Sequence, residues 1–125
     1  MNALEEHILP FAGTEIINTD SVPLEKSSVD LVFLILSVHE IRRNAERILF
    51  FKQIKAALTE NGKIIVVEHT IDGFNFTAYN FGFFHFLSRK TWLQKFKVAE
   101  LILDCEIKIT PFITVYSLTQ NGNSP

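Results

Sequence analysis

The segment Val29–Glu40 constrains the fold of this chain more than any other. It follows the polar run at 25–28, is apolar from Leu31 to Leu36, and turns polar at His39 and Glu40. A strand with one wet face alternates apolar and polar residues, whereas an uninterrupted apolar run needs cover on both faces. The run therefore predicts a central strand of a parallel sheet. Ligands of open α/β sheets bind beyond the carboxyl ends of such strands, so Ser37 to Glu40 are predicted to face a ligand crevice.

Length and composition limit the classes of protein that this chain can be. With 125 residues it is large enough for one domain with a hydrophobic core. A net charge of −2 gives no electrostatic reason to expect a nucleic-acid partner. No segment has the roughly 20 apolar residues that cross a bilayer, so no membrane partner is predicted. The single Cys105, with no secretory signal in the opening residues, indicates a reducing, cytoplasmic location.

Two amphipathic patterns predict helices. The first has Asn44 as its cap and continues to about Glu60, where Asn61-Gly62 is typical of a left-handed helix stop. The second has Ser88 as its cap, and its apolar side comprises Thr91, Trp92, Phe96, Ala99 and Leu101-Ile102.

Four further segments are predicted to be strands. Thr14–Thr19 is a short candidate that ends at Asp20, and Lys63–Glu68 is a second buried strand, parallel to the central one. Residues 105–110 and 112–118 alternate on either side of Pro111, which predicts an antiparallel hairpin. The polar tail at 119–125 is expected to fray.

The order of these features resembles class I S-adenosylmethionine (SAM) dependent methyltransferases. The matching residues are Asp20 after a short strand, the turn Pro23-Leu24, the strand opening Asp30-Leu31-Val32, the stop Asn61-Gly62 and the strand Ile64–Glu68, which ends in an acid. The resemblance implies a single truncated domain over residues 1–125. Its fold would be a partial Rossmann-like sheet, mostly parallel, with a C-terminal antiparallel hairpin and helices on both faces.

The resemblance also implies where SAM would bind. It places the cofactor against Asp20, Ser21, Ser37, Val38 and His39. A carboxylate at Asp20 suits the adenine amino group, because an ionised carboxylate only accepts hydrogen bonds. The alternative is that Asp20 merely starts a turn. None of the five glycines is spaced like the family's glycine-rich donor loop, so we expect this chain alone to bind SAM poorly and to be inactive by itself.

Three groups of residues are candidates for the chemistry. His39-Glu40 could contact donor or acceptor, or could be a helix-entry pair held by neighbouring backbone. His69 could accept a proton from an acceptor hydroxyl or amine, or could be a solvated surface residue. In the resembled family the segment after His69 shapes the acceptor pocket. The resemblance therefore assigns to this pocket Glu40 and four aromatic residues, Phe74, Phe76, Tyr79 and Phe83. The alternative is that these aromatic rings simply pack on the sheet. No metal site is predicted, because His39-Glu40 lacks the second histidine of a His-Glu-x-x-His motif.

The function that the resemblance implies is methyl transfer from SAM to a small-molecule acceptor. Such a reaction needs little covalent help from the protein, which agrees with the absence of a recognisable nucleophile motif. A rival hypothesis from another class is a noncatalytic α/β interaction module, or a degenerate methyltransferase fragment, that keeps the sheet without the reaction.

One edge of the central strand is expected to be unusual. The strand order implied by the resemblance is 3-2-1-4-5-7-6, and this chain lacks the first strand, which normally pairs with the strand Leu31–Leu36. An apolar strand with an open edge is a template for another chain. Either Thr14–Thr19 moves over to fill the gap, or two copies pair as a homodimer, or the chain aggregates; the first outcome is favoured for an isolated monomer.

Overall fold

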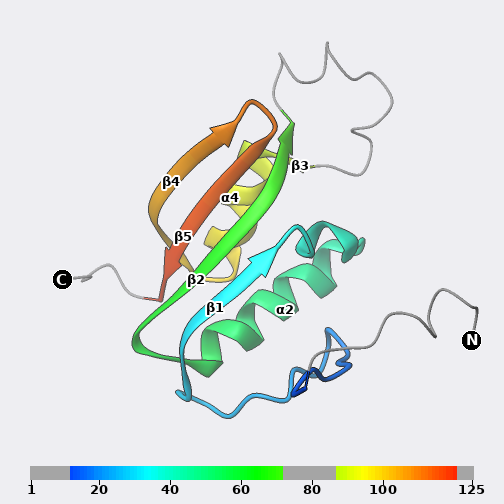
Figure 1. Cartoon of the computed structure of the whole chain (residues 1–125), viewed down its shortest axis with the longest axis vertical. Helices are drawn as coiled ribbons and strands as arrows, with labels where there is room; N and C mark the ends of the chain where they lie inside the picture. The colour runs from blue at the N-terminus through cyan, green and yellow to red at the C-terminus, as the bar shows by residue number, and fades with distance from the viewer. Residues whose placement is uncertain (1–11, 72–86, 121–125) are drawn as a thin grey trace, which may run out of the picture.

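The computed structural model describes residues 12–71 and 87–120, which form a mixed β-sheet and two α-helices (Figure 1). The elements in chain order are β1 (Val29–Ile35), the 3-10 helix η1 (Val38–Glu40), α2 (Asn44–Ala57), β2 (Leu58–Ile71), β3 (Leu87–Ser88), α4 (Arg89–Val98), β4 (Ile102–Thr110) and β5 (Ile113–Thr119).

The sheet has the order β1-β2-β5-β4, with the short β3 paired to β2. β1 runs parallel to β2, in a register that extends from Leu31 opposite Lys63 to Ile35 opposite Val67. β5 is antiparallel to both β2 and β4, so the predicted C-terminal hairpin is confirmed. The order is the 4-5-7-6 end of the arrangement that the resemblance implied. Because only the pairs β1–β2 and β2–β3 are parallel in the described residues, the sheet there is mixed rather than mostly parallel.

Both helices pack on the same face of the sheet (Figure 1). The ring of Phe51 in α2 meets that of Phe96 in α4 edge to face at 5.4 Å, and Phe96 meets Tyr116 of β5 at 5.2 Å. Alternate residues of β2, including the fully buried Ile64 and Val66, complete this core. The prediction of helices on both faces is therefore wrong for the part of the chain that the structure describes.

β1 consequently has one buried and one open face. Leu34 is buried against the helices, but Phe33 and Ile35 are each 59% exposed and Leu31 is 48% exposed. The prediction of cover on both faces of this strand is not met, because the two helices of the described residues lie under its even-numbered side chains only.

The turn from α2 into β2 differs from the prediction. The helix ends at Ala57, and Leu58 is already extended at φ −70° and ψ 140°. Gly62 does not adopt the left-handed conformation of a helix stop. Instead it lies where an added Cβ would be 3.1 Å from Leu58 Cβ and from the Thr59 carbonyl oxygen. The glycine serves a close backbone approach, where the β1–β2 register shifts.

α4 begins and ends with recognisable caps. Ser88 Oγ accepts a hydrogen bond from the Thr91 amide at 3.2 Å, which confirms the predicted cap. At the other end the Leu101 amide donates to Phe96 O and the Glu100 amide to Lys97 O, which is the Schellman arrangement. The helix thus stops before Ile102, which was predicted on its apolar side but begins β4.

The ends of the chain add two observations. Thr119, the first residue of the tail predicted to fray, belongs to β5 and is buried. Residues 121–125 lie outside the described residues.

Residues Thr14–Thr19 do not form the predicted strand. They contribute only an isolated bridge between Asn18 and Ser21. The loop is held against α2 instead: Gln53 Nε2 donates to Thr19 O, and Gln53 Oε1 accepts from the Val22 amide, both at 2.8 Å. The prediction that this segment moves beside the central strand is therefore wrong.

Candidate functional site

The site is organised by Glu68, whose side chain is fully buried in β2 near its carboxyl end. Its Oε1 accepts hydrogen bonds from the Val38 amide at 2.8 Å and the His39 amide at 3.3 Å. Its Oε2 lies 2.7 Å from His39 Nδ1. One carboxylate therefore fixes both the backbone of η1 and the orientation of the His39 ring.

The structure brings together the two histidines that were predicted to be catalytic. The rings of His39 and His69 lie 6.4 Å apart, inclined at 70°. The other ring nitrogen of His39, Nε2, lies 3.0 Å from Glu40 Oε1. The Glu40 side chain is 71% exposed, whereas that of His39 is 10% exposed. Glu68 thus contacts the His39 imidazole on its buried side, and Glu40 contacts it on the side that faces solvent.

A buried guanidinium balances the buried carboxylate. Arg47 of α2 is 5% exposed, and its Nη2 donates to the carbonyl oxygens of Ile41 and Arg42. Burial lowers the pKa of Arg47, and the negative charge of Glu68 acts in the opposite direction. Arg47 therefore braces the linker between η1 and α2 while it offsets the charge of Glu68.

A cavity of about 600 Å³ opens beside η1, at the carboxyl end of β1. Three residues of the predicted crevice, Ser37, Val38 and Glu40, line it. Its remaining lining combines apolar side chains with charged ones: Ile17, Thr19, Leu34, Ile41, Arg42, Arg43, Glu46 and Phe50. Binding sites for small molecules have volumes of this order and a similar mixture of apolar and polar groups.

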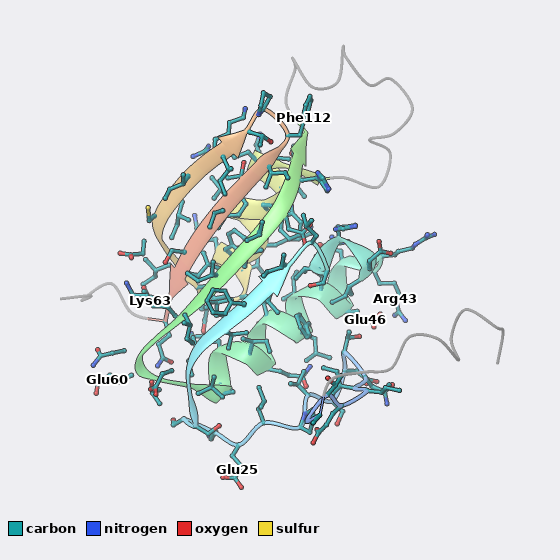
Figure 2. All side chains as sticks on the ribbon, in the orientation of Figure 1. Glu25, Arg43, Glu46, Glu60, Lys63 and Phe112 are labelled. Atoms are coloured by element: carbon teal, nitrogen blue, oxygen red, sulfur yellow. The ribbon has the colours of Figure 1, made fainter. Side chains whose placement is uncertain are left out.

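Asp20 lines a neighbouring cavity of about 360 Å³. Arg43 and Glu46, side by side at the start of α2 in Figure 2, line both cavities. The hydroxyl of Thr19 donates to Glu46, which ties the Asp20 loop to this wall. Asp20 also lies inside a turn that the Ser21 amide closes on Asn18 O at 3.1 Å. The geometry thus accommodates both interpretations of Asp20, a turn residue and a ligand contact.

The remaining candidates fall outside this geometry. Phe74, Phe76, Tyr79 and Phe83, proposed for the acceptor pocket, lie outside the described residues. Within the described ranges no group of three or more His, Cys, Asp or Glu side chains is arranged to hold a metal ion. None of the helices described is long and apolar enough to cross a membrane.

Reasoning from the sequence missed Glu68 and Arg47 as parts of the site. Glu68 was noted only as the acid that ends a buried strand, although a carboxylate at that position has to find a partner. Arg47 sits on the buried side of α2 among apolar residues, and a charge on an apolar helix face was the signal that could have revealed it.

No family model and no curated protein matches the sequence. Solved structures do match. A SAM-dependent methyltransferase from Leishmania major has a TM-score of 0.65 and 19% identity, over 82% of this chain and 43% of that one. One from Aquifex aeolicus has a TM-score of 0.66 and 13% identity, over 82% of this chain and 52% of that one.

A third structure, LepI in complex with SAM, has a TM-score of 0.69 and 14% identity, over 94% of this chain and 33% of that one. The described part of this chain has the fold of SAM-dependent methyltransferases. At these identities the likeness establishes the methyltransferase fold alone. The chain spans about half the length, or less, of these three proteins.

Proposed function

We propose that this chain forms the part of a SAM-dependent methyltransferase domain that holds the adenosine side of SAM and a small-molecule acceptor. The observation that carries the proposal is the Glu68 carboxylate, which fixes the backbone of η1. Val38 and Glu40 of η1 line a cavity of about 600 Å³ at the carboxyl end of β1. Ligands of open α/β sheets bind at this edge.

The residues of the two cavities suit the adenosine part of SAM. Asp20 offers a carboxylate for an exocyclic amine, and Leu34 and Phe50 offer apolar surface for a ring. Ser37 and Val38 lie just beyond β1, after Leu36, and would contact the same ligand. SAM supplies a methyl group that is already activated on a sulfonium, so the protein has mainly to orient the acceptor and receive its proton.

We assign the role of receiving that proton to His39, which belongs to η1 between Val38 and Glu40, two residues that line the larger cavity. If Nδ1 donates its hydrogen to Glu68, the neutral ring carries its lone pair on Nε2. An acceptor hydroxyl would then replace the exposed Glu40 carboxylate beside Nε2. Glu68 acts as a positioning residue, and His69, with its ring 6.4 Å away, is the second candidate for proton transfer.

Nuclear magnetic resonance titration with S-adenosylhomocysteine tests the donor site, since it detects binding that is too weak for calorimetry. We expect amide shifts at Asp20, Ser21 and Ser37–His39 at millimolar ligand, reduced in Asp20→Asn. Glu25→Gln, in the exposed loop before β1, is the matched control and should titrate like the wild type. Shifts confined to β4, or none at millimolar ligand, would refute the donor site.

The rival hypothesis of a noncatalytic interaction module has one specific observation in its favour, the exposed apolar side chains of β1. It predicts partner binding without any response to S-adenosylhomocysteine. For either function we propose the cytoplasm as the location, because Cys105 is an exposed free thiol and a reducing compartment keeps such a group unmodified.

A further inference from the structure

The segment from Ser37 to Arg43 forms much of the wall of the larger cavity. Every residue of this segment except His39 lines that cavity. η1 has only three residues, and Ser37, which precedes it, makes no side-chain cap. At the other end of the segment, Arg43 makes no side-chain cap for α2 either. The free backbone groups of the segment therefore depend on partners from elsewhere in the fold.

Two buried side chains of opposite charge are such partners. Glu68 accepts hydrogen bonds from the first two amides of η1. Arg47 Nη2 donates to Ile41 O and, at 3.5 Å, to Arg42 O, just beyond η1. A carboxylate thus holds the amide end of η1, and a guanidinium holds the carbonyls that follow it. These signs suit the backbone, because negative charge is favoured at the amide end of a helix and positive charge at the carbonyl end.

The linker 41–43 is fastened through Arg47. Within residues 12–71 and 87–120, no other side chain forms a hydrogen bond with the backbone of this linker. The Arg47 amide also donates to Arg43 O at 3.0 Å, so one residue bonds the carbonyls of all three linker positions. Arg47 itself lines neither of the two cavities, so it can affect a ligand only through the linker.

We propose that Arg47 is a positioning residue of the ligand site, which holds the linker 41–43 in the conformation that forms the wall of the larger cavity. The inference rests on the proposed function, since S-adenosylhomocysteine is the ligand that reports it. Without the guanidinium, two linker carbonyls lose their donor and buried Glu68 loses an offsetting charge. The linker then populates other conformations, and the apparent affinity falls with the fraction that keeps the observed one.

Nuclear magnetic resonance titration with S-adenosylhomocysteine tests this role. The observable is the initial slope of the Ser37 amide shift against ligand concentration, which is proportional to affinity far below saturation. We expect Arg47→Met to reduce this slope at least about five-fold, as when the competent conformation falls to about a fifth of the molecules. Lys52→Met, which removes a cation from an exposed position of the same helix, is the matched control and should titrate like the wild type.

Two further variants separate positioning from stability. Arg47→Lys keeps the charge that offsets Glu68 and so favours folding, but it places a compact ammonium on a shorter side chain; it should reduce the slope at least about two-fold. Ile54→Val lowers the stability of the same helix from a buried position away from the linker. It should titrate like the wild type as long as the amides of β5 keep their native shifts.

The outcomes distinguish this inference from the proposed function. A wild-type slope in either Arg47 variant would overturn the role of Arg47 and leave the proposed function standing. Equal reductions in Arg47→Met and Ile54→Val would also overturn it, because lost stability would then explain both. A wild type that shows no shift with S-adenosylhomocysteine would overturn the proposed function and this inference together.

Discussion

Glu68 Oε2 lies 2.7 Å from His39 Nδ1, although 29 positions separate the two residues in the sequence. The parallel register of β1 and β2 makes this contact, because it brings the carboxyl ends of both strands to one edge of the sheet. The same carboxylate holds two amides of η1, so the backbone beside the cavity depends on one buried side chain.

Glu68→Gln should lower the free energy of unfolding by about 2–3 kcal/mol. The amide keeps the shape but loses the charge-assisted bonds, and its NH₂ group can face His39 Nδ1 only if the ring changes tautomer. Urea denaturation measures the loss. Glu106→Gln, which weakens a pair with the largely exposed Arg89, is the control and should cost distinctly less than Glu68→Gln. Equal losses in both variants would contradict an organising role for Glu68.

The sequence predicted β1, β2, α2, α4 and the hairpin because each carries its signal locally. The apolar run before His39 and the alternation around Pro111 are examples, and so is the cap at Ser88. Parallel strands place the residues at their carboxyl ends at one edge of the sheet. His39 and His69 were each predicted to follow such a strand, and their rings are neighbours there.

The errors arose where a pattern permits two structures. An apolar run indicates that a strand favours burial, but it does not indicate which other segments pack against it. The exposed face of β1 was therefore not predicted. Thr14–Thr19 has a strand-like composition, yet a strand forms only where a neighbour pairs with it. Asn61-Gly62 suits a helix stop, but glycine equally permits the close approach to Leu58 and Thr59.

Gly62→Ala should destabilise the fold by about 1–3 kcal/mol. The new Cβ would lie 3.1 Å from Leu58 Cβ and from Thr59 O, and a fully buried Leu58 has no free space into which to withdraw. Thermal unfolding measures the effect, and Asn61→Ala, at the exposed neighbouring position, serves as the control. Equal melting temperatures for Gly62→Ala and Asn61→Ala would show that the turn adjusts to the added Cβ more easily than the 3.1 Å contacts imply.

Lys95→Met should stabilise the fold by about 1 kcal/mol at neutral pH, with a gain that shrinks toward pH 10.5. Lys95 is buried, and its pKa lies below 10.5. Burial is the larger cause of this decrease, and the positive charge of Arg47 is the smaller one. No carboxylate in the described ranges forms an ion pair with it. As the pH rises from the folded pKa toward 10.5, the unfolded chain binds more protons than the folded one. Wild-type stability therefore rises in that window, whereas the methionine variant has no such titration.

Denaturant unfolding of wild type and Lys95→Met at several alkaline pH values checks this difference. Tyr116, whose pKa is raised by burial, titrates in both proteins and cancels in the comparison. Lys97→Met, at an exposed position of the same helix, should change stability by less than about 0.5 kcal/mol. A Lys95→Met gain that does not vary with pH would mean that the ammonium reaches solvent unhindered.

Glu100→Gly should stabilise the fold by about 0.5–1 kcal/mol. Glu100 holds the left-handed position after α4 at φ 62°, where a side chain is strained and glycine is not. The substitution also removes the contact of Glu100 with Lys55 at 3.5 Å, but that Glu side chain is 80% exposed, and such pairs contribute little. Glu100→Ala separates the two effects, because it loses the ion pair and keeps the backbone strain. A higher midpoint of thermal unfolding for Glu100→Gly alone would assign the gain to the backbone, whereas equal midpoints for the two variants would show that the left-handed residue costs nothing at this helix end.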